Sequence, residues 1–465
     1  MKKIACFSIP AHGHTNPMIQ VVAELIKRGN AVRFYSFDEF EEKIESTGAE
    51  FISCDEFLPK LTKEESEVIK SVSTTEMTIQ DIRITLLMDE FLDKEFESFK
   101  PDVVYTDSVC FWGKLNAIKH NVPMVVSTST FAFNQWSSQY MASSPRELAD
   151  MIFGLPRVSK ELKKLEAYGY KIKRALDLVQ SDNNTDSIVY TSKRFQPYSE
   201  SFSDHYAFVG PSISSSLMPQ KEKERPLVYI SMGTVVNNRP DFYSKCISAL
   251  KDMDLDVVIS CGNSIDIKRF GNLDDNIKVF PYVNQLEVLS RADVFITHCG
   301  MNSVSESLYM ATPMVLYPQT NEQKAVARRV MEIGAGIKLV DDSANGIRNA
   351  ICNILNGKTY THGADKCRDD FLSCKGPAGA AEFVLSAPHS AKESKVVERL
   401  NHASKRFKGI YWIIAIALIL LSGFHFHWKC TWIFAILSGV LSYPIYSRYQ
   451  RALAKKWLSG ESDEQ

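Results

Sequence analysis

Two short segments, one in each half of the chain, carry residues whose types and spacing suit acid–base and phosphate chemistry. The first, Ala11–Pro17, places His12 and His14 directly after an apolar run. A neutral imidazole can take a proton from an alcohol near pH 7, so either histidine is a candidate general base. Asp107 ends another apolar run and is the candidate carboxylate for orienting the imidazolium. Histidines are also common in loops and in packing, so residue type alone leaves both interpretations open.

The second segment follows the apolar run Val294–Thr297 and reads His298-Cys299-Gly300-Met301-Asn302-Ser303. A glycine-containing turn from a strand into a helix, expected to begin at about Ser303, offers free backbone N–H groups and the positive end of the helix dipole. Both suit a diphosphate, to which His298 can also donate. The segment has no P-loop lysine, which disfavours ATP-type chemistry. Ser303 to Glu306 also matches a plain capping box, which is the structural alternative.

Alternating short strands and helices must position these segments. The strands expected before the linker are Ile4–Ile9, Ala31–Phe37, Asp102–Thr106 and Pro123–Ser127. After a stretch rich in Ser, Pro and charge at Gly210–Arg225, the strands expected are Leu227–Met232, Leu255–Ser260, Ile277–Phe280, Val294–Thr297 and Met314–Tyr317. Apolar runs without alternation are typical of buried parallel strands. Two such series predict an α/β fold with two doubly wound, Rossmann-like domains that face a shared cleft.

The C-terminal part of the chain differs in composition. Ile410–Phe424 and Trp432–Tyr446 are uncharged apolar runs, and basic residues precede and follow the pair. This pattern favours a helical membrane hairpin with both ends in the cytoplasm, although two helices buried against the globular part are the alternative. The apolar run at Ile4–Ile9 is too short for a signal peptide. The expected divisions are domains at 1–210 and 226–386, a linker at 211–225, a connecting helix at 387–408, the hairpin at 409–447 and a polar tail at 448–465.

Composition excludes some functions. The chain has 465 residues, and its formal net charge of −1 gives no basic field for nucleic acid. Its ten cysteines lack a CxxC pair, which favours free thiols in a reducing compartment over a disulfide framework or a zinc site.

The segment Phe280–Leu339 resembles the UDP-glycosyltransferase superfamily. The family pattern is an aromatic residue, Gln, His-Cys-Gly-x-Asn-Ser, Glu, and Pro-x-x-x-acid-Gln. In this chain the pattern is met, in order, by Tyr282, Gln285, His298–Ser303, Glu306 and Pro318–Gln323.

The resemblance implies the GT-B fold and a role for each matched residue. Tyr282 would stack on the uracil, whose edge Gln285 and the Val283 backbone would read. His298, Gly300, Asn302 and Ser303 would hold the diphosphate, Glu306 the ribose, and Glu322 and Gln323 the sugar. The loop with Gly233 and Thr234 resembles the second phosphate-side loop of the family, although an ordinary turn is the alternative. Tyr282 and Glu322 depart from the Trp and Asp of plant members, which leaves the choice of donor sugar open.

The first half is similar to the macrolide-type glycosyltransferases of this superfamily, whose motif aligns the catalytic histidine with His14 and its acid with Asp107. The resemblance implies a first domain that binds the acceptor and a second that binds the UDP-sugar as co-substrate, with no other cofactor. We expect an inverting transfer of a hexose without a metal, made to a small lipophilic acceptor by a membrane-anchored enzyme whose catalytic part is cytoplasmic. A nucleotide-sugar epimerase and a non-catalytic, membrane-bound UDP-sugar sensor are the alternatives.

Overall fold

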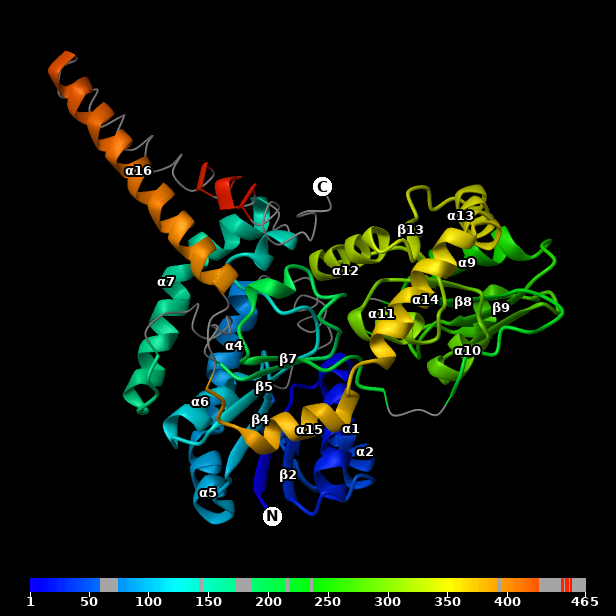
Figure 1. The fold of residues 1–465 in the computed structure, drawn as a ribbon. Helices are drawn as coiled ribbons and strands as arrows, with labels where there is room; N and C mark the ends of the chain where they lie inside the picture. Colours follow the sequence, from blue (N-terminus) through cyan, green and yellow to red (C-terminus); the bar gives the residue numbers. More distant parts are fainter. Residues whose placement is uncertain are drawn as a thin grey trace.

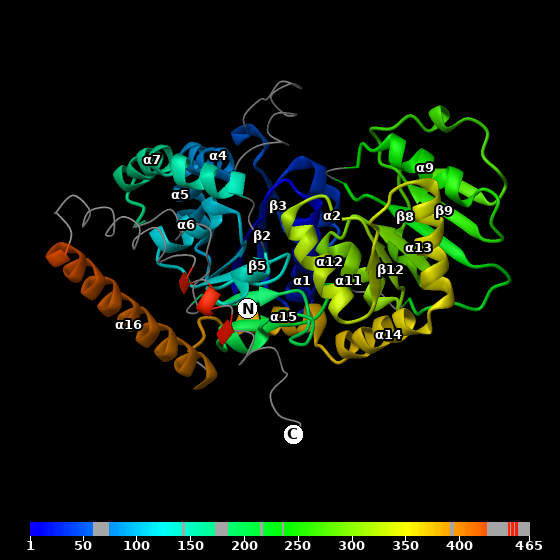
Figure 2. The ribbon, with the colours of Figure 1, turned by 90° about the horizontal axis from the view of Figure 1, so that it is seen from above.

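Two parallel sheets, one from each half of the chain, lie next to each other with helices packed on their faces (Figures 1 and 2). The computed structural model describes residues 1–58, 74–141, 145–172, 185–213, 217–234, 237–390, 395–425, 445–446, 448–450 and 452–453. The prediction of two doubly wound domains is confirmed.

The first sheet has the strand order β3-β2-β1-β4-β5-β6-β7, with every neighbouring pair parallel. Its strands are β1 (Lys3–Phe7), β2 (Ala31–Ser36), β3 (Glu50–Ser53), β4 (Val103–Asp107), β5 (Met124–Thr128), β6 (Ser187–Val189) and β7 (Tyr206–Phe208). The four strands expected from the sequence are present as β1, β2, β4 and β5. The strands β3, β6 and β7 were not predicted, because polar residues closely flank or interrupt these short segments and leave no clear apolar run.

The second sheet has the order β10-β9-β8-β11-β12-β13 and is also parallel throughout. Its strands are β8 (Leu227–Ser231), β9 (Asp256–Ser260), β10 (Ile277–Phe280), β11 (Val294–Thr297), β12 (Met314–Leu316) and β13 (Gly336–Lys338). Five of these match the expected strands, and only the three-residue β13 was not foreseen. In both sheets the order reverses beside the first strand, where ligands of doubly wound folds bind.

Helices cover both sheets. The first domain has α1 (His12–Lys27), α2 (Glu41–Glu45), α4 (Thr74–Leu87), α5 (Asp89–Phe99), α6 (Phe111–Lys119) and α7 (Pro145–Ala167). The rest of the chain has α9 (Pro240–Leu250), α10 (Gln285–Arg291), α11 (Met301–Tyr309), α12 (Asn321–Glu332), α13 (Ala344–Asn356), α14 (Lys358–Leu372), α15 (Gly376–Ser386) and α16 (Lys395–His425).

Helix α15 returns to the first domain, although the predicted second domain extends to residue 386. Ala380, Ala381 and Val384 pack in the same buried cluster as β1 and α1, and Arg28 Nη2 donates to the carbonyl of Ala378 at 3.0 Å. In Figure 1, α15 lies beside α1 in the first domain. The physical domain border therefore lies just before α15, because the apolar face of that helix is buried against α1.

The two domains are also joined by a shared apolar cluster. Phe131 and Phe195 of the first domain pack with Tyr229, Phe295 and other residues of the second. The described cysteines form no disulfide, and most of them are buried, in agreement with the predicted free thiols.

Helix α16 extends away from the globular body (Figures 1 and 2). It runs without a break across the expected border at residue 408 and contains the first predicted membrane run, Ile410–Phe424. The second run lies outside the described residues except for Ile445 and Tyr446. A search of the described residues finds no helix long and apolar enough to cross a membrane. The predicted spanning hairpin therefore has no support in this part of the chain.

Candidate active site

His14 and Asp107 come together at the carboxyl edge of the first sheet. His14 lies in the first turn of α1, directly after β1, and Asp107 ends the neighbouring strand β4. The His14 Nδ1 atom is 2.9 Å from Asp107 Oδ2, and the backbone N–H of Val109 donates to Asp107 Oδ1 at 2.9 Å. The Asp107 side chain is fully buried, whereas 29% of the His14 side chain is exposed. A buried acid thus holds an imidazole that remains partly accessible to solvent.

The environment of His14 favours its protonated form. Burial alone lowers the pKa of the imidazole, but the charge and hydrogen bond of Asp107, together with the Glu322 carboxylate, leave this pKa above its ordinary value. Ser129 Oγ is also 3.1 Å from His14 Nδ1. Since both neighbours contact Nδ1, the neutral ring carries its proton there and keeps a lone pair at Nε2. Nε2 is therefore the atom that can accept a proton from a substrate.

The second histidine of the segment has other neighbours. His12 Nε2 is 3.7 Å from Glu39 Oε2, and its ring packs edge-on against Phe40 at a centroid distance of 5.0 Å. Of the two candidate histidines, it is His14 that contacts the buried carboxylate of Asp107.

His298 lies between two glycines from different loops of the second domain. A Cβ atom added at Gly233 would be 2.4 Å from the ring, and one added at Gly300 would be 2.5 Å from it. Burial lowers the pKa of His298 to about 4, so the ring is neutral near pH 7. Its Nδ1 atom is buried and has no hydrogen-bond partner within the described part of the chain. A neutral donor held this closely suits a phosphate oxygen. Thr234, next to Gly233, is exposed.

The N-terminus of α11 does not form the alternative capping box at Ser303. The helix begins at Met301 with Gly300 as its N-cap, and no side chain caps it. Ser303 is therefore inside the helix and cannot serve as the predicted cap. The uncapped N–H groups suit a diphosphate. Asn302, in the same turn, donates from Nδ2 to the carbonyl of Gly13 at 3.0 Å and so reaches the first domain.

The residues expected to bind the nucleoside form a connected group. Gln285 Nε2 donates to Glu306 Oε2 at 2.6 Å and to Ser303 Oγ at 3.2 Å, while Tyr229 donates to Gln285 Oε1 at 3.2 Å. Burial raises the pKa of Glu306 to about 7. Gln285 thus orients Glu306 as well as being a candidate for reading a base. Tyr282, just before α10, is 78% exposed, as a stacking platform requires. Val283 is partly buried against the apolar cluster that contains Tyr229 and Phe295.

Glu322 and Gln323, adjacent in the first turn of α12, are placed differently. Glu322 belongs to the second domain, but its charge contributes to raising the pKa of His14 in the first. Gln323 is 9% exposed, and its Oε1 accepts from the N–H groups of Gln319 and Thr320 at 2.8 and 3.1 Å. With Thr320 it forms the capping box of α12. Gln323 therefore supports the loop that precedes α12, a task that the sequence pattern did not indicate.

Sequence reasoning missed two polar residues beside the site. Ser129, which contacts His14, follows β5 and could have been found by extending the strand-end rule to that strand. Arg239 donates to the side chains of Gln319 and Tyr317 and so supports the same loop as Gln323. It lies just before α9, and nothing in its sequence context marks it.

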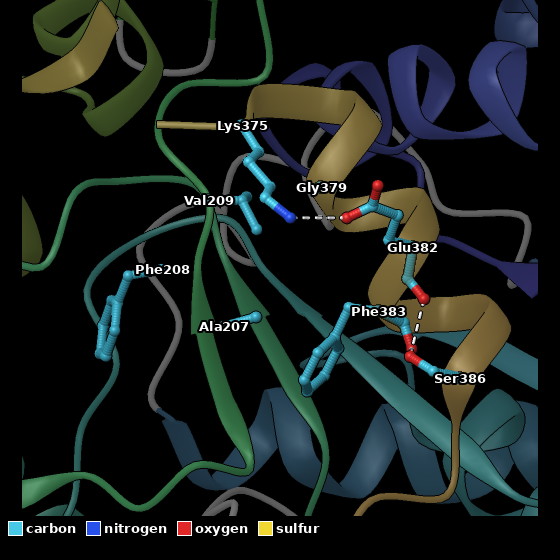
Figure 3. Close-up of a pocket in the computed structure, with 8 residues that line it drawn as sticks. All are labelled: Ala207, Phe208, Val209, Lys375, Gly379, Glu382, Phe383 and Ser386. Atoms are coloured by element: carbon cyan, nitrogen blue, oxygen red, sulfur yellow. Dashed lines mark hydrogen bonds and ion pairs between the residues drawn. The ribbon is translucent and has the colours of Figure 1, made fainter. Parts of the chain in front are cut away.

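A separate shallow groove of about 330 Å³ lies between β7 and α15 (Figure 3). Lys375 and Glu382 form an ion pair of 2.9 Å along it, and Phe208 and Phe383 line it. It contains none of the predicted site residues. Within the described ranges, no group of three or more His, Cys, Asp or Glu side chains is arranged to hold a metal ion.

Comparison with solved structures identifies the fold. The fold matches solved structures of glycosyltransferases. The glycotransferase of kitacinnamycin has a TM-score of 0.70 at 23% identity, with 82% of this chain and 98% of that one covered. The calicheamicin glycosyltransferase CalG4 has a TM-score of 0.69 at 24% identity, with 84% and 100% covered. The two domains therefore form the GT-B fold.

Sequence comparison identifies the family. Residues 214–366 match the family described as UDP-glucoronosyl and UDP-glucosyl transferase. The NDP-glycosyltransferase YjiC of Bacillus licheniformis is 32% identical over 81% of this chain and 99% of its own length. The oleandomycin glycosyltransferase of Streptomyces antibioticus is 28% identical, with 84% and 92% covered. The chain belongs to the UDP-glycosyltransferase superfamily, and it is accordingly a glycosyltransferase that takes its sugar from a nucleotide-sugar donor.

Proposed function

We propose that the protein moves a hexose from a UDP-sugar to the hydroxyl of a small lipophilic acceptor, with inversion at the anomeric carbon. The observation that carries this proposal is the contact between His14 Nδ1 and buried Asp107, which leaves Nε2 as the basic atom. A base held by a buried carboxylate has the correct tautomer and a stabilised cationic form.

The reaction is a single displacement. His14 Nε2 takes the proton from the acceptor hydroxyl as its oxygen forms a bond to the anomeric carbon. The bond from that carbon to the diphosphate oxygen breaks on the opposite face, and UDP leaves with the electron pair. An α-linked donor therefore gives a β-glycoside. The N–H groups at the start of α11 and the neutral ring of His298 stabilise the charge that develops on the diphosphate.

The donor contacts that we propose follow the family pattern. Tyr282 stacks on uracil, Val283 and Gln285 read its edge, and Glu306 binds the ribose. The diphosphate lies against Gly233, Thr234, His298, Gly300, Asn302 and Ser303. Glu322 binds the sugar hydroxyls directly, and Gln323 acts largely through the loop that it caps. The proposed mechanism involves no metal.

We also propose that α16 binds a bilayer surface and brings the enzyme to lipophilic acceptors. Ile410, Ile413, Ile414 and Ile416 are 48%, 69%, 54% and 53% exposed on the part of α16 that extends from the body. Basic residues precede them at 405, 406 and 408. Exposed aliphatic residues beside such charges suit an anionic membrane.

A flotation assay with vesicles of mixed neutral and anionic lipid tests this membrane binding, and replacing Ile413 and Ile414 by Glu should abolish it. Ile118→Glu, at an exposed site elsewhere, is the control.

The test of transfer is UDP release by the full-length protein, with several UDP-sugars and a panel of hydrophobic alcohols, in the presence and absence of EDTA. His14→Ala should abolish acceptor-dependent release, whereas the matched His12→Ala should retain most of it. NMR of the product gives the anomeric configuration. Activity that survives in His14→Ala would favour a different reaction such as epimerisation. UDP-sugar binding without turnover of any acceptor would favour a sensor.

A further inference from the structure

Helix α12 belongs to the second domain, but its C-terminal half is hydrogen-bonded to the first. Arg329 donates from Nε to the carbonyl of Phe195 at 3.0 Å and from Nη2 to the carbonyl of Arg194 at 2.6 Å. Both carbonyls lie in the first domain, in the segment that follows β6. Because the guanidinium group is a planar fork of donors, two neighbouring acceptors fix its direction as well as its position.

A second set of contacts joins the same helix to Tyr140 of the first domain. The Tyr140 hydroxyl donates to Glu332 Oε2 at 2.6 Å, and Arg329 Nη1 donates to the same oxygen at 3.1 Å. Arg328 donates from Nε to Glu332 Oε1 at 2.9 Å, and its guanidinium carbon lies 4.2 Å from the centre of the Tyr140 ring. Tyr140 is buried, so the network is anchored in the packed part of the first domain. We call Tyr140, Arg329 and Glu332 the interdomain latch.

Arg329 of the latch lies on the same face of α12 as Glu322. It follows Glu322 by seven residues within one helix, which is close to two turns and about 10 Å along the axis. Val326, between them, belongs to the apolar cluster that includes Phe131 and Phe195 of the first domain. This face of α12 is therefore directed to the first domain, and Glu322 at its N-terminal end shares that direction.

We propose that the interdomain latch positions the first turn of α12, and the sugar bound there, relative to His14 in the first domain. The inference rests on the proposed transfer and on the proposed contact of Glu322 with the sugar. Because that donor site is in one domain and the base is in the other, the reacting atoms meet only if the domains keep a fixed separation. A helix is a stiff element, so contacts in its C-terminal half also set the place of its first turn.

The electrostatics of the site agree with this arrangement, since the charge of Glu322 contributes to raising the pKa of His14. The hydrogen bond from Asn302 to the carbonyl of Gly13 joins the domains at a second point, next to the proposed base. The members of the latch act through α12 and are therefore positioning residues. Loss of the latch should lower the rate of transfer more than the affinity for the donor.

The test compares turnover with UDP binding in the full-length protein. Arg329→Ala should lower kcat about 10- to 100-fold, because a misplacement of about 1 Å can cost this much. Calorimetry should give a UDP affinity within about twofold of wild type, since the proposed UDP contacts all lie in the second domain. Arg329→Lys keeps a donor for one carbonyl and should lose less activity. Tyr140→Phe removes only the hydroxyl and should lower kcat about 3- to 10-fold.

Arg348→Ala is the matched control. Arg348 Nε donates to the carbonyl of Ala249 at 2.9 Å, and both residues lie in the second domain. This variant loses an arginine–carbonyl hydrogen bond without affecting the domain border, so neither kcat nor UDP affinity should change. Melting temperatures of all variants separate these effects from misfolding. Equal losses of kcat and UDP affinity in Arg329→Ala would overturn the inference.

A direct measurement of domain separation tests the latch without turnover. Spin labels attached through non-natural residues at the exposed positions Ile118 of α6 and Lys324 of α12 report this distance by pulsed electron spin resonance. With UDP bound, the distance distribution should be narrow in wild type and shifted or broader in Arg329→Ala. An unchanged distribution would overturn the inference. If no acceptor turns over, the proposed function fails, but the distribution still decides whether the latch sets the domain separation.

Discussion

The side chain of Asn302 in the second domain donates to the carbonyl of Gly13 in the first, at 3.0 Å. Gly13 immediately precedes His14, and Asn302 lies in the uncapped first turn of α11. The turn proposed to hold the diphosphate is therefore hydrogen-bonded to the segment that carries the proposed base. We expect Asn302→Ala to lower both the UDP affinity and kcat by about 10-fold each. Calorimetry measures the affinity, and a UDP-release assay measures kcat. An unchanged kcat at saturating donor would contradict a role for this contact in positioning His14.

Activity should depend on pH through His14. A base acts in its deprotonated form, and the pKa of His14 is raised above its ordinary value of 6.5. The value of kcat/KM should therefore rise with pH through a pKa above 6.5. Asp107→Asn removes the main influence that raises the pKa, so the rise should move to lower pH while the maximum falls about 100- to 10,000-fold. If the midpoint of the pH profile is unchanged in Asp107→Asn, the observed titration does not belong to His14.

UDP binding should have a pH dependence of its own. The Glu306 carboxyl has a pKa of about 7, and accepting hydroxyl hydrogen bonds favours its ionised form. UDP should therefore bind up to about tenfold more tightly at pH 8 than at pH 6, and binding at pH 6 should release a proton from Glu306. His298, with a pKa of about 4, does not titrate in this range. Calorimetry in buffers of different ionisation enthalpy measures the proton, and Glu306→Gln should reduce the pH dependence to the part that comes from the terminal phosphate of UDP.

The glycines beside His298 should be sensitive to substitution. Gly233 has a φ of +76°, and a Cβ there would overlap the His298 ring. We expect Gly233→Ala to lose about 1–2 kcal/mol of stability from backbone strain and to bind UDP more than tenfold more weakly, because the ring must move. Gly271→Ala is the matched control, with a φ of +67° and nothing within 4 Å of the new Cβ. It should lose similar stability but retain UDP binding. Thermal unfolding and calorimetry report the two effects.

Substitutions at the adjacent residues Glu322 and Gln323 should have different effects, the first on donor binding and the second on stability. Gln323→Ala leaves two backbone N–H groups without their acceptor and should lower the free energy of unfolding by about 1–3 kcal/mol. Gln323→Glu keeps an acceptor oxygen and should restore most of that loss. Glu322→Gln should leave the melting temperature unchanged and raise the donor KM. Equal melting temperatures for wild type and Gln323→Ala would refute the capping role.

The sequence by itself determined most of the strands and the residues at their ends. Runs such as Ile4–Ile9 and Val294–Thr297 are apolar without alternation, which only a strand buried on both faces requires. Because parallel strands present their carboxyl ends at one edge, Asp107 could be paired in advance with the segment that carries His12 and His14, and the family resemblance then selected His14. The donor-site residues were assigned by resemblance to the family pattern, which lies within one continuous segment.

Tertiary structure alone decided which contacts these residues make. Ser129 meets His14, and His298 lies between Gly233 and Gly300, only because strands far apart in sequence are neighbours in the sheets. Burial then sets the pKa values of His298 and Glu306, and burial is a property of packing rather than of residue type. The same holds for α15, whose small apolar residues gave no sign that they would pack on the first domain.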